Sequence, residues 1–108
     1  MNYIDRGAPA ETVPVTFTVR GVERVRGAGR LLALANVELD VAGVVLTLQG
    51  CQVIRTATGV ECRSPVWRHP ATGAWLPAVL LPPELAEAVA AEVLAEAISS
   101  GMVRVVPR

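Results

Sequence analysis

Hydrophobic and polar positions along the chain follow two different periods, which divide it into a β region and an α region. In residues 15–80 hydrophobic side chains recur mostly at every second position, as in strands that bury one face. Turns rich in glycine interrupt this region at residues 26–30, 42–43 and 56–59. The predicted strands are residues 15–25 with a bulge at Gly21, 31–39, 44–55, 60–64 and, as an edge strand because of Pro77, 74–80.

The period then changes to that of a helix over residues 83–99. Pro83 suits a first helical position and Gly101 is a typical stop signal. The face of the helix that we expect to be buried consists of Ala86, Val89, Ala90, Val93, Leu94 and Ala97. Because alanine dominates this face, the helix can approach a sheet closely. The predicted fold class is therefore α+β, with an antiparallel sheet of about four or five strands followed by one C-terminal α-helix.

The length of 108 residues predicts a single domain over residues 15–108. Residues 1–14 are small and polar with two prolines, so we expect a flexible N-terminal tail. Residues 65–73 predict an irregular loop, and residues 102–108 a short C-terminal strand or tail. A chain of this size builds a small core, for which self-association would add stability.

Composition places the chain among ordered, soluble proteins. Hydrophobic residues make up 52% and charged residues 19%, which excludes a disordered protein. The sequence has neither a signal-peptide pattern nor an apolar run of about 18 residues, so we expect a cytoplasmic protein without membrane contact. Ten acidic residues balance ten basic ones, which excludes the strongly basic footprint of a typical nucleic-acid binder.

The zero net charge hides a segregation of charge along the chain. Residues 15–76 carry seven arginines against four acidic residues, whereas the predicted helix carries four glutamates and no basic residue. All basic residues are arginines, whose planar guanidinium suits phosphate, carboxylate and aromatic partners. Arg55 and Arg63 lie on the two arms of one predicted hairpin, and Arg68 follows in the loop. These three residues predict a surface that contacts an anionic nucleic-acid strand, with Trp67 as a platform on which a base stacks. The alternative is that they are ordinary solvated arginines on outward strand positions.

Other candidate chemistry is sparse. Trp75 is expected to cap the edge of the core, and the Gly27-Ala28-Gly29 run is a turn rather than a phosphate loop. The register of the hairpin around Gly59 decides which residue lies opposite Cys62. A register in which paired residue numbers add up to 113 places Cys51 there, whereas a three-residue turn that ends at Gly59 places Ile54 there. We expect reduced, buried thiols, no metal site, no cofactor and no small-molecule substrate. An enzyme would depend on His69, the single histidine, and we expect no catalysis.

The ordered set of elements resembles the stage V sporulation protein G (SpoVG) family, small bacterial regulators described as septation proteins. The resemblance covers about residues 15–95. It is carried by Gly29-Arg30 with Ala33, Ala35, Val37, Leu39 and Asp40 in the second strand, Gly59 with residues 60–64, Pro65, Arg68, Gly73, Trp75 and Pro82. Ser64, Val66 and Trp67 replace the Met, Ser and Lys of the family's Met-Pro-Ser-Lys-Arg motif.

The resemblance implies a homodimer with a curved antiparallel sheet packed on a helix. It also implies a regulator that binds DNA or RNA, with Pro65 and Arg68 on the motif associated with nucleic acid. The function expected from the sequence is therefore weak, salt-dependent nucleic-acid binding by a non-catalytic homodimer. The candidate nucleic-acid-binding residues are Arg55, Arg63, Pro65, Trp67 and Arg68. The alternative is a protein-protein interaction module on the same dimeric fold that has lost nucleic-acid binding.

Overall fold

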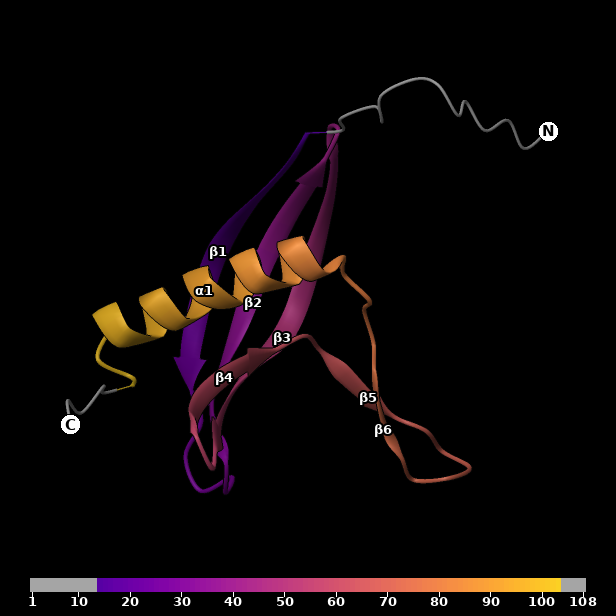
Figure 1. Cartoon of the computed structure of the whole chain (residues 1–108). Helices are drawn as coiled ribbons and strands as arrows, with labels where there is room; N and C mark the ends of the chain where they lie inside the picture. Colours follow the sequence, from indigo (N-terminus) through magenta and orange to yellow (C-terminus); the bar gives the residue numbers. More distant parts are fainter. Residues whose placement is uncertain (1–13, 104–108) are drawn as a thin grey trace.

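A computed structural model of the chain describes residues 14–103, which form an α+β fold (Figure 1). Its elements are β1 (Val15–Arg24), β2 (Leu31–Val41), β3 (Val44–Thr56), β4 (Gly59–Arg63), β5 (Val66–Arg68), β6 (Trp75–Pro77) and α1 (Pro83–Ser99). The expected N-terminal tail lies outside the described residues except for Pro14, and so does most of the expected C-terminal strand or tail. Met102 and Val103, where that strand was expected to begin, form a bend instead.

The first four strands form one antiparallel sheet in the order β1-β2-β3-β4, so each strand pairs with its neighbour in the chain. The turn between β2 and β3 has two central residues with positive φ, Ala42 at 51° and Gly43 at 90°. Both positive angles are typical of the tight hairpin turn that matches strand twist. The predicted bulge in the first strand is confirmed, because the β1–β2 register shifts between Val19 and Gly21.

A second bulge, which the sequence pattern did not reveal, lies at Gly50 in β3. Ala35 pairs with Cys51 but Asn36 pairs with Gln49, so Gly50 is the extra residue. Gly50 has a φ of 83°, and its N–H donates to Asn36 Oδ1 at 3.3 Å. The extra residue resets the alternation of side chains, so that Leu48 and Cys51 are both buried although they are three positions apart.

The core lies between the sheet and α1, which covers one face of it (Figure 1). The middle of β2 contributes small side chains, Ala33, Ala35 and Val37, which are at most 1% exposed. The helix contributes Val89, Val93 and Ala97, which lie on the predicted face. Small side chains on both elements allow the helix to approach the sheet closely. Val103 closes the core after the helix, where its N–H donates to the carbonyl of Ala97 at 3.2 Å.

Residues 66–77 form a second structure, a two-stranded sheet of β5 and β6 that projects away from the main sheet (Figure 1). This corrects two expectations: residues 65–73 are not all irregular, and the expected fifth strand covers only Trp75–Pro77 and pairs with β5. The reason is local, because Pro65 ends β4 and cannot donate to a ladder. Pro77 lies at the end of β6, opposite Val66, in agreement with the edge position expected for it.

The helix crosses the strands, and among residues 14–103 no second helix or sheet covers the end of the sheet at the turn between β2 and β3 (Figure 1). Together with the projecting hairpin, this gives a radius of gyration of 16.7 Å, compared with about 13 Å for a compact chain of similar length. Within residues 14–103, no helix is long and apolar enough to cross a membrane.

The close contact of α1 with β2 predicts that an enlarged side chain at the contact destabilises the fold. We expect Ala35→Leu to lower the free energy of unfolding by about 1–3 kcal/mol, because Ala35 is 1% exposed and the added carbons must displace the helix. Urea denaturation measures this change. Ala91→Leu, on the exposed side of the same helix, is the matched control and should change the stability by less than about 0.5 kcal/mol.

Candidate nucleic-acid interface

An open groove lies between the β5–β6 hairpin and the β3–β4 side of the sheet, with a volume of about 730 Å³. Its lining residues are Arg30, Gln52, Arg63, Val66, Trp75, Leu76 and Pro77. Gln52 and Arg63 are direct cross-strand neighbours on β3 and β4. Arg30 joins them from the turn before β2, where its carbonyl accepts a hydrogen bond from the N–H of Arg55 at 2.8 Å. The groove therefore combines guanidinium groups, an amide and an exposed indole.

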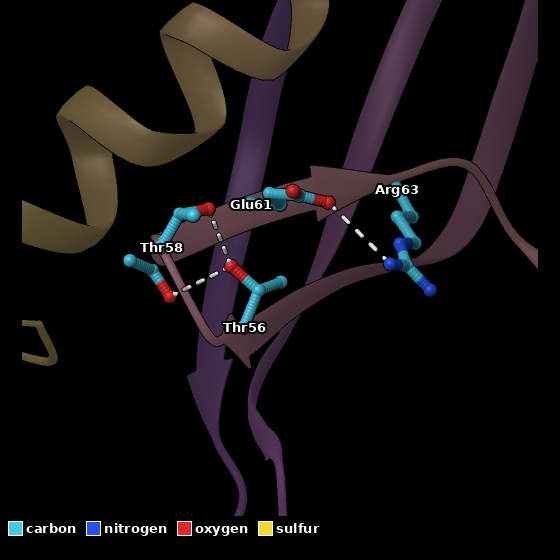
Figure 2. Close-up of polar contacts among 5 residues, drawn as sticks. Thr56, Thr58, Glu61 and Arg63 are labelled. Carbon is cyan, nitrogen blue, oxygen red and sulfur yellow. Dashed lines mark hydrogen bonds and ion pairs between the residues drawn. The ribbon is translucent and has the colours of Figure 1, made fainter.

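Arg63 is held only loosely on the sheet side of the groove. Its Nη2 donates to Glu61 Oε2 at 3.4 Å, and the two side chains are 57% and 50% exposed. Figure 2 shows this pair beside the β3–β4 turn, where Thr56 Oγ1 lies 3.4 Å from Thr58 Oγ1 and donates to the Gly59 carbonyl. Exposed ion pairs of this kind contribute little free energy. The Arg63 guanidinium can therefore exchange Glu61 for a phosphate.

Arg68 and Trp75 form a cation–π pair on the hairpin. They are direct partners in the β5–β6 register, and the Arg68 guanidinium carbon lies 5.9 Å from the centre of the Trp75 ring. Gly73 in the hairpin loop has a φ of 72°, and a Cβ there would lie 3.6 Å from Arg68 Nη2. Trp75 is 65% exposed, so the expectation that it caps the core is wrong. Arg68 shares a hairpin face with Val66 and Trp75, which line the groove, since side chains alternate along a strand.

His69 stabilises the hairpin loop. Its Nδ1 accepts hydrogen bonds from the N–H groups of Ala71 at 3.1 Å and Thr72 at 3.3 Å. Its backbone N–H donates to the Ala74 carbonyl at 2.8 Å, and its carbonyl accepts from Gly73. Because Nδ1 accepts, the proton of the neutral ring resides on Nε2. These bonds give the single histidine a role in holding the loop that presents Arg68 and Trp75.

The structure brings together only part of the predicted residue set. Arg63 lines the groove and Arg68 lies beside it on the hairpin, as described above. Arg55 lies three positions from Gln52 on β3, so the two side chains point to opposite faces of the sheet. Trp67 pairs with Leu76 on the other face of the hairpin, and its ring centre lies 5.5 Å from that of His69. Pro65 is buried where the hairpin leaves β4.

Two groove residues, Arg30 and Trp75, were missed by the reasoning from sequence. A hairpin reading of residues 66–77 around the Gly73 turn would have placed Trp75 opposite Arg68. No local pattern marks Arg30, because it reaches the groove through the pairing of β2 with β3, where Leu31 lies opposite Ile54.

Two other arginines are engaged within the fold. Arg20 Nε and Nη2 donate to the two carboxylate oxygens of Glu38, each at 3.1 Å. This hydrogen bonding lowers the pKa of Glu38 and raises the pKa of Arg20. Arg24 Nη2 donates to the Gly101 carbonyl at 3.1 Å and ties β1 to the end of the helix. The positive charge available around the groove therefore comes from Arg30, Arg63 and Arg68, against Glu61.

The two cysteines lie on the helix-covered face of the sheet. In the β3–β4 register the paired residue numbers add up to 115, so Cys62 lies opposite Val53. Both expected pairings are wrong because the turn contains two residues, Ala57 and Thr58, rather than the lengths considered. Cys51 and Cys62 line one cavity of about 50 Å³ beneath Val89. Both are free thiols, and no group of three possible metal ligands occurs in the part of the chain that the structure describes.

No family model, no curated protein and no solved structure matches the chain.

Burial predicts that both thiols react slowly with disulfide reagents. Desolvation and the neighbouring Cys51 raise the pKa of Cys62 to about 11, and desolvation also raises the pKa of Cys51. At pH 8 about one Cys62 in a thousand is a thiolate, which is the reactive form. In 6 M guanidinium chloride the unfolded protein reacts completely with Ellman's reagent. In the same time we expect less than about a tenth of the thiols of the folded protein to react. Fast reaction of the folded protein would contradict this burial.

Proposed function

We propose that the protein is a SpoVG-like, non-catalytic regulator that binds DNA or RNA weakly through the groove beside the hairpin. The observation that supports this most directly is the exposed Trp75 in the groove, with Arg68 paired to it and with Arg63 and Arg30 in the same lining. A guanidinium supplies a planar donor for phosphate, and an exposed indole supplies a stacking surface for a base. The combination fits one flexible anionic strand that carries aromatic bases.

The number of charges sets the expected strength of binding. Three arginines lie in or beside the groove, and one acidic residue, Glu61, opposes them. Each chain can therefore contact a few phosphates. For single strands the logarithm of the binding constant falls by about 0.7 per contacted phosphate for each tenfold rise in salt. Three contacts correspond to a slope of about −2, or a loss of about 15-fold between 50 and 200 mM salt. The proposed binding is therefore weak and strongly salt-dependent.

The fold is compatible with the SpoVG resemblance. The resemblance implies an antiparallel sheet packed on a helix, and the structure has such a sheet and one C-terminal helix. Pro65 takes a structural role at the start of the hairpin in this proposal, while Arg68 takes the phosphate contact. We propose, again on the resemblance, that the protein acts as a homodimer. Light scattering at micromolar concentration should then give twice the chain mass of 11.4 kDa.

A protein-interaction module on the same fold is the second candidate, and one observation favours it. The exposed glutamates of α1, Glu84, Glu87, Glu92 and Glu96, form an acidic surface without a basic residue on the helix. Such a surface suits a basic protein partner and repels nucleic acid. In this case the arginines around the groove would be dispensable.

The groove arginines should carry the binding of single-stranded oligonucleotides. We expect Arg63→Gln and Arg68→Gln each to weaken binding about three- to tenfold at 50 mM salt and to reduce the magnitude of the salt slope by about 0.7. Arg26→Gln is the matched control, because Arg26 is exposed in the turn before β2 and belongs neither to the groove lining nor to the hairpin. Isothermal titration calorimetry across salt concentrations measures both quantities. Binding that is absent in the wild type at 50 mM salt, or equal in all three variants, refutes the proposed site and favours the second candidate.

The two tryptophans separate the groove face of the hairpin from its other face. We expect Trp75→Ala to weaken oligonucleotide binding about tenfold or more, because one stacked base is worth about 1–3 kcal/mol. Trp67→Ala should change it less than about twofold, since Trp67 lies on the hairpin face opposite Trp75 and does not line the groove. The same titration measures both variants, and circular dichroism confirms that they fold. If Trp67→Ala weakens binding more than Trp75→Ala does, the base stacks on Trp67, as the sequence alone suggested.

A further inference from the structure

The end of the sheet near the Ala42–Gly43 turn carries apolar rows that residues 14–103 cover only in part. On the helix side, Val15, Val41 and Val44 form one cross-strand row, and Phe17, Leu39 and Leu46 form the next. Leu39, in the middle of the second row, is 2% exposed, whereas Val15 is 39% exposed. Val44 is 60% exposed and Leu46 is 51% exposed. A sheet face of this composition requires a second layer.

Leu80 stands beside these rows, in the segment that leads from the hairpin to α1. It is 87% exposed, the largest fraction among the exposed large hydrophobic residues of the described chain. It borders an apolar hollow of about 500 Å³, whose floor and walls include Leu39, Leu46 and Leu85. A projecting leucine and an apolar hollow of matching chemistry therefore lie side by side on one surface. We call this surface the terminal patch; it comprises Val15, Val44, Leu46, Leu80 and the lining of the hollow.

We propose that the terminal patch is the surface through which two copies of this chain associate, with Leu80 of each copy seated in the hollow of the other. This inference depends on the proposed self-association but not on the nucleic-acid binding. A two-fold interface requires one surface to be complementary to itself, and a projection next to a hollow meets that requirement. The patch is a candidate for an interface because contiguous apolar surfaces of several hundred Å² are rare on monomers.

Charge and surface chemistry favour a second copy as the occupant. The chain carries no charged residue between Asp40 and Arg55, and the segment from Leu76 to Pro83 is also uncharged. The formal net charge of zero means that two copies meet without net repulsion. The exposed members of the patch, Val15, Val44, Leu46 and Leu80, are all apolar, and an identical patch on a second copy is complementary to them in chemistry. A charged protein partner would find no complementary charge within the patch.

Sedimentation equilibrium of the full chain between 1 and 100 µM tests this interface. We expect Leu80→Glu and Leu46→Glu each to raise the dimer dissociation constant at least about tenfold, because each places an uncompensated carboxylate in the interface. Ile98→Glu is the matched control, since Ile98 is 44% exposed at the far end of α1, and it should leave the constant unchanged. Thermal unfolding verifies that Leu80→Glu, at an exposed position, remains folded.

Each outcome decides between the occupants of the patch. A wild-type dimer that Leu80→Glu and Leu46→Glu leave intact refutes this interface but retains self-association through another surface. A wild-type monomer at 100 µM refutes the interface and the proposed dimer together, and indicates that other residues of the chain or another protein cover the patch. Oligonucleotide binding by the same variants is measured separately, so a failure of the groove proposal is distinguishable from a failure of the interface.

Discussion

The whole structure depends on one contact, that of a single helix with small side chains in the middle of a long sheet. The helix of 17 residues is about 25 Å long and about 10 Å wide, and it crosses strands of up to 13 residues that extend about 43 Å. It therefore covers a band of each strand and leaves the rest to other layers. Ala33 and Ala35 are fully buried at this contact, and the exposed apolar end of the sheet follows from the limits of what the helix can cover.

Two surface regions of different character flank the part of the sheet that the helix covers. At the Ala42–Gly43 end, cross-strand rows of valine and leucine are only partly covered, so a second layer from another molecule can pack on them. β4 ends at Arg63, opposite Gln52 of β3, and after Pro65 the chain turns outward into the hairpin, which borders the arginine-lined groove. Leu80 lies in the segment that joins these two regions. The fold thus separates an apolar surface from a cationic one within one small domain.

Elements with strong local periodicity were predictable from the sequence, and features that depend on register were not. The helix of residues 83–99 and the four strands follow from a clear period and from turn residues such as Gly43. The Gly50 bulge separates Leu48 from Cys51, and the shift of alternation that it causes was established only by the pairing with β2. The β3–β4 register depends on the length of the turn, and the observed register places Cys62 opposite Val53, one position from Ile54 and two from Cys51.

The candidate site was predictable only in part, for the same reason. Arg63 and Arg68 follow from their position near a break in the sheet. Trp75 and Arg30 join them through the folding of a three-residue strand onto its partner and through the pairing of β2 with β3. Such contacts between distant segments carry no signature in a local window of the sequence, so the composition of the groove appeared only in the structure.

The positions of the two tryptophans have a consequence for spectroscopy. Both indoles of the chain lie on the β5–β6 hairpin, on its two faces, and none lies in the core between the sheet and α1. Intrinsic fluorescence excited at the red edge of the indole band therefore reports on the hairpin alone. Local opening of this arm would change the emission while the core is intact, and an optical melting curve would describe the arm rather than the domain.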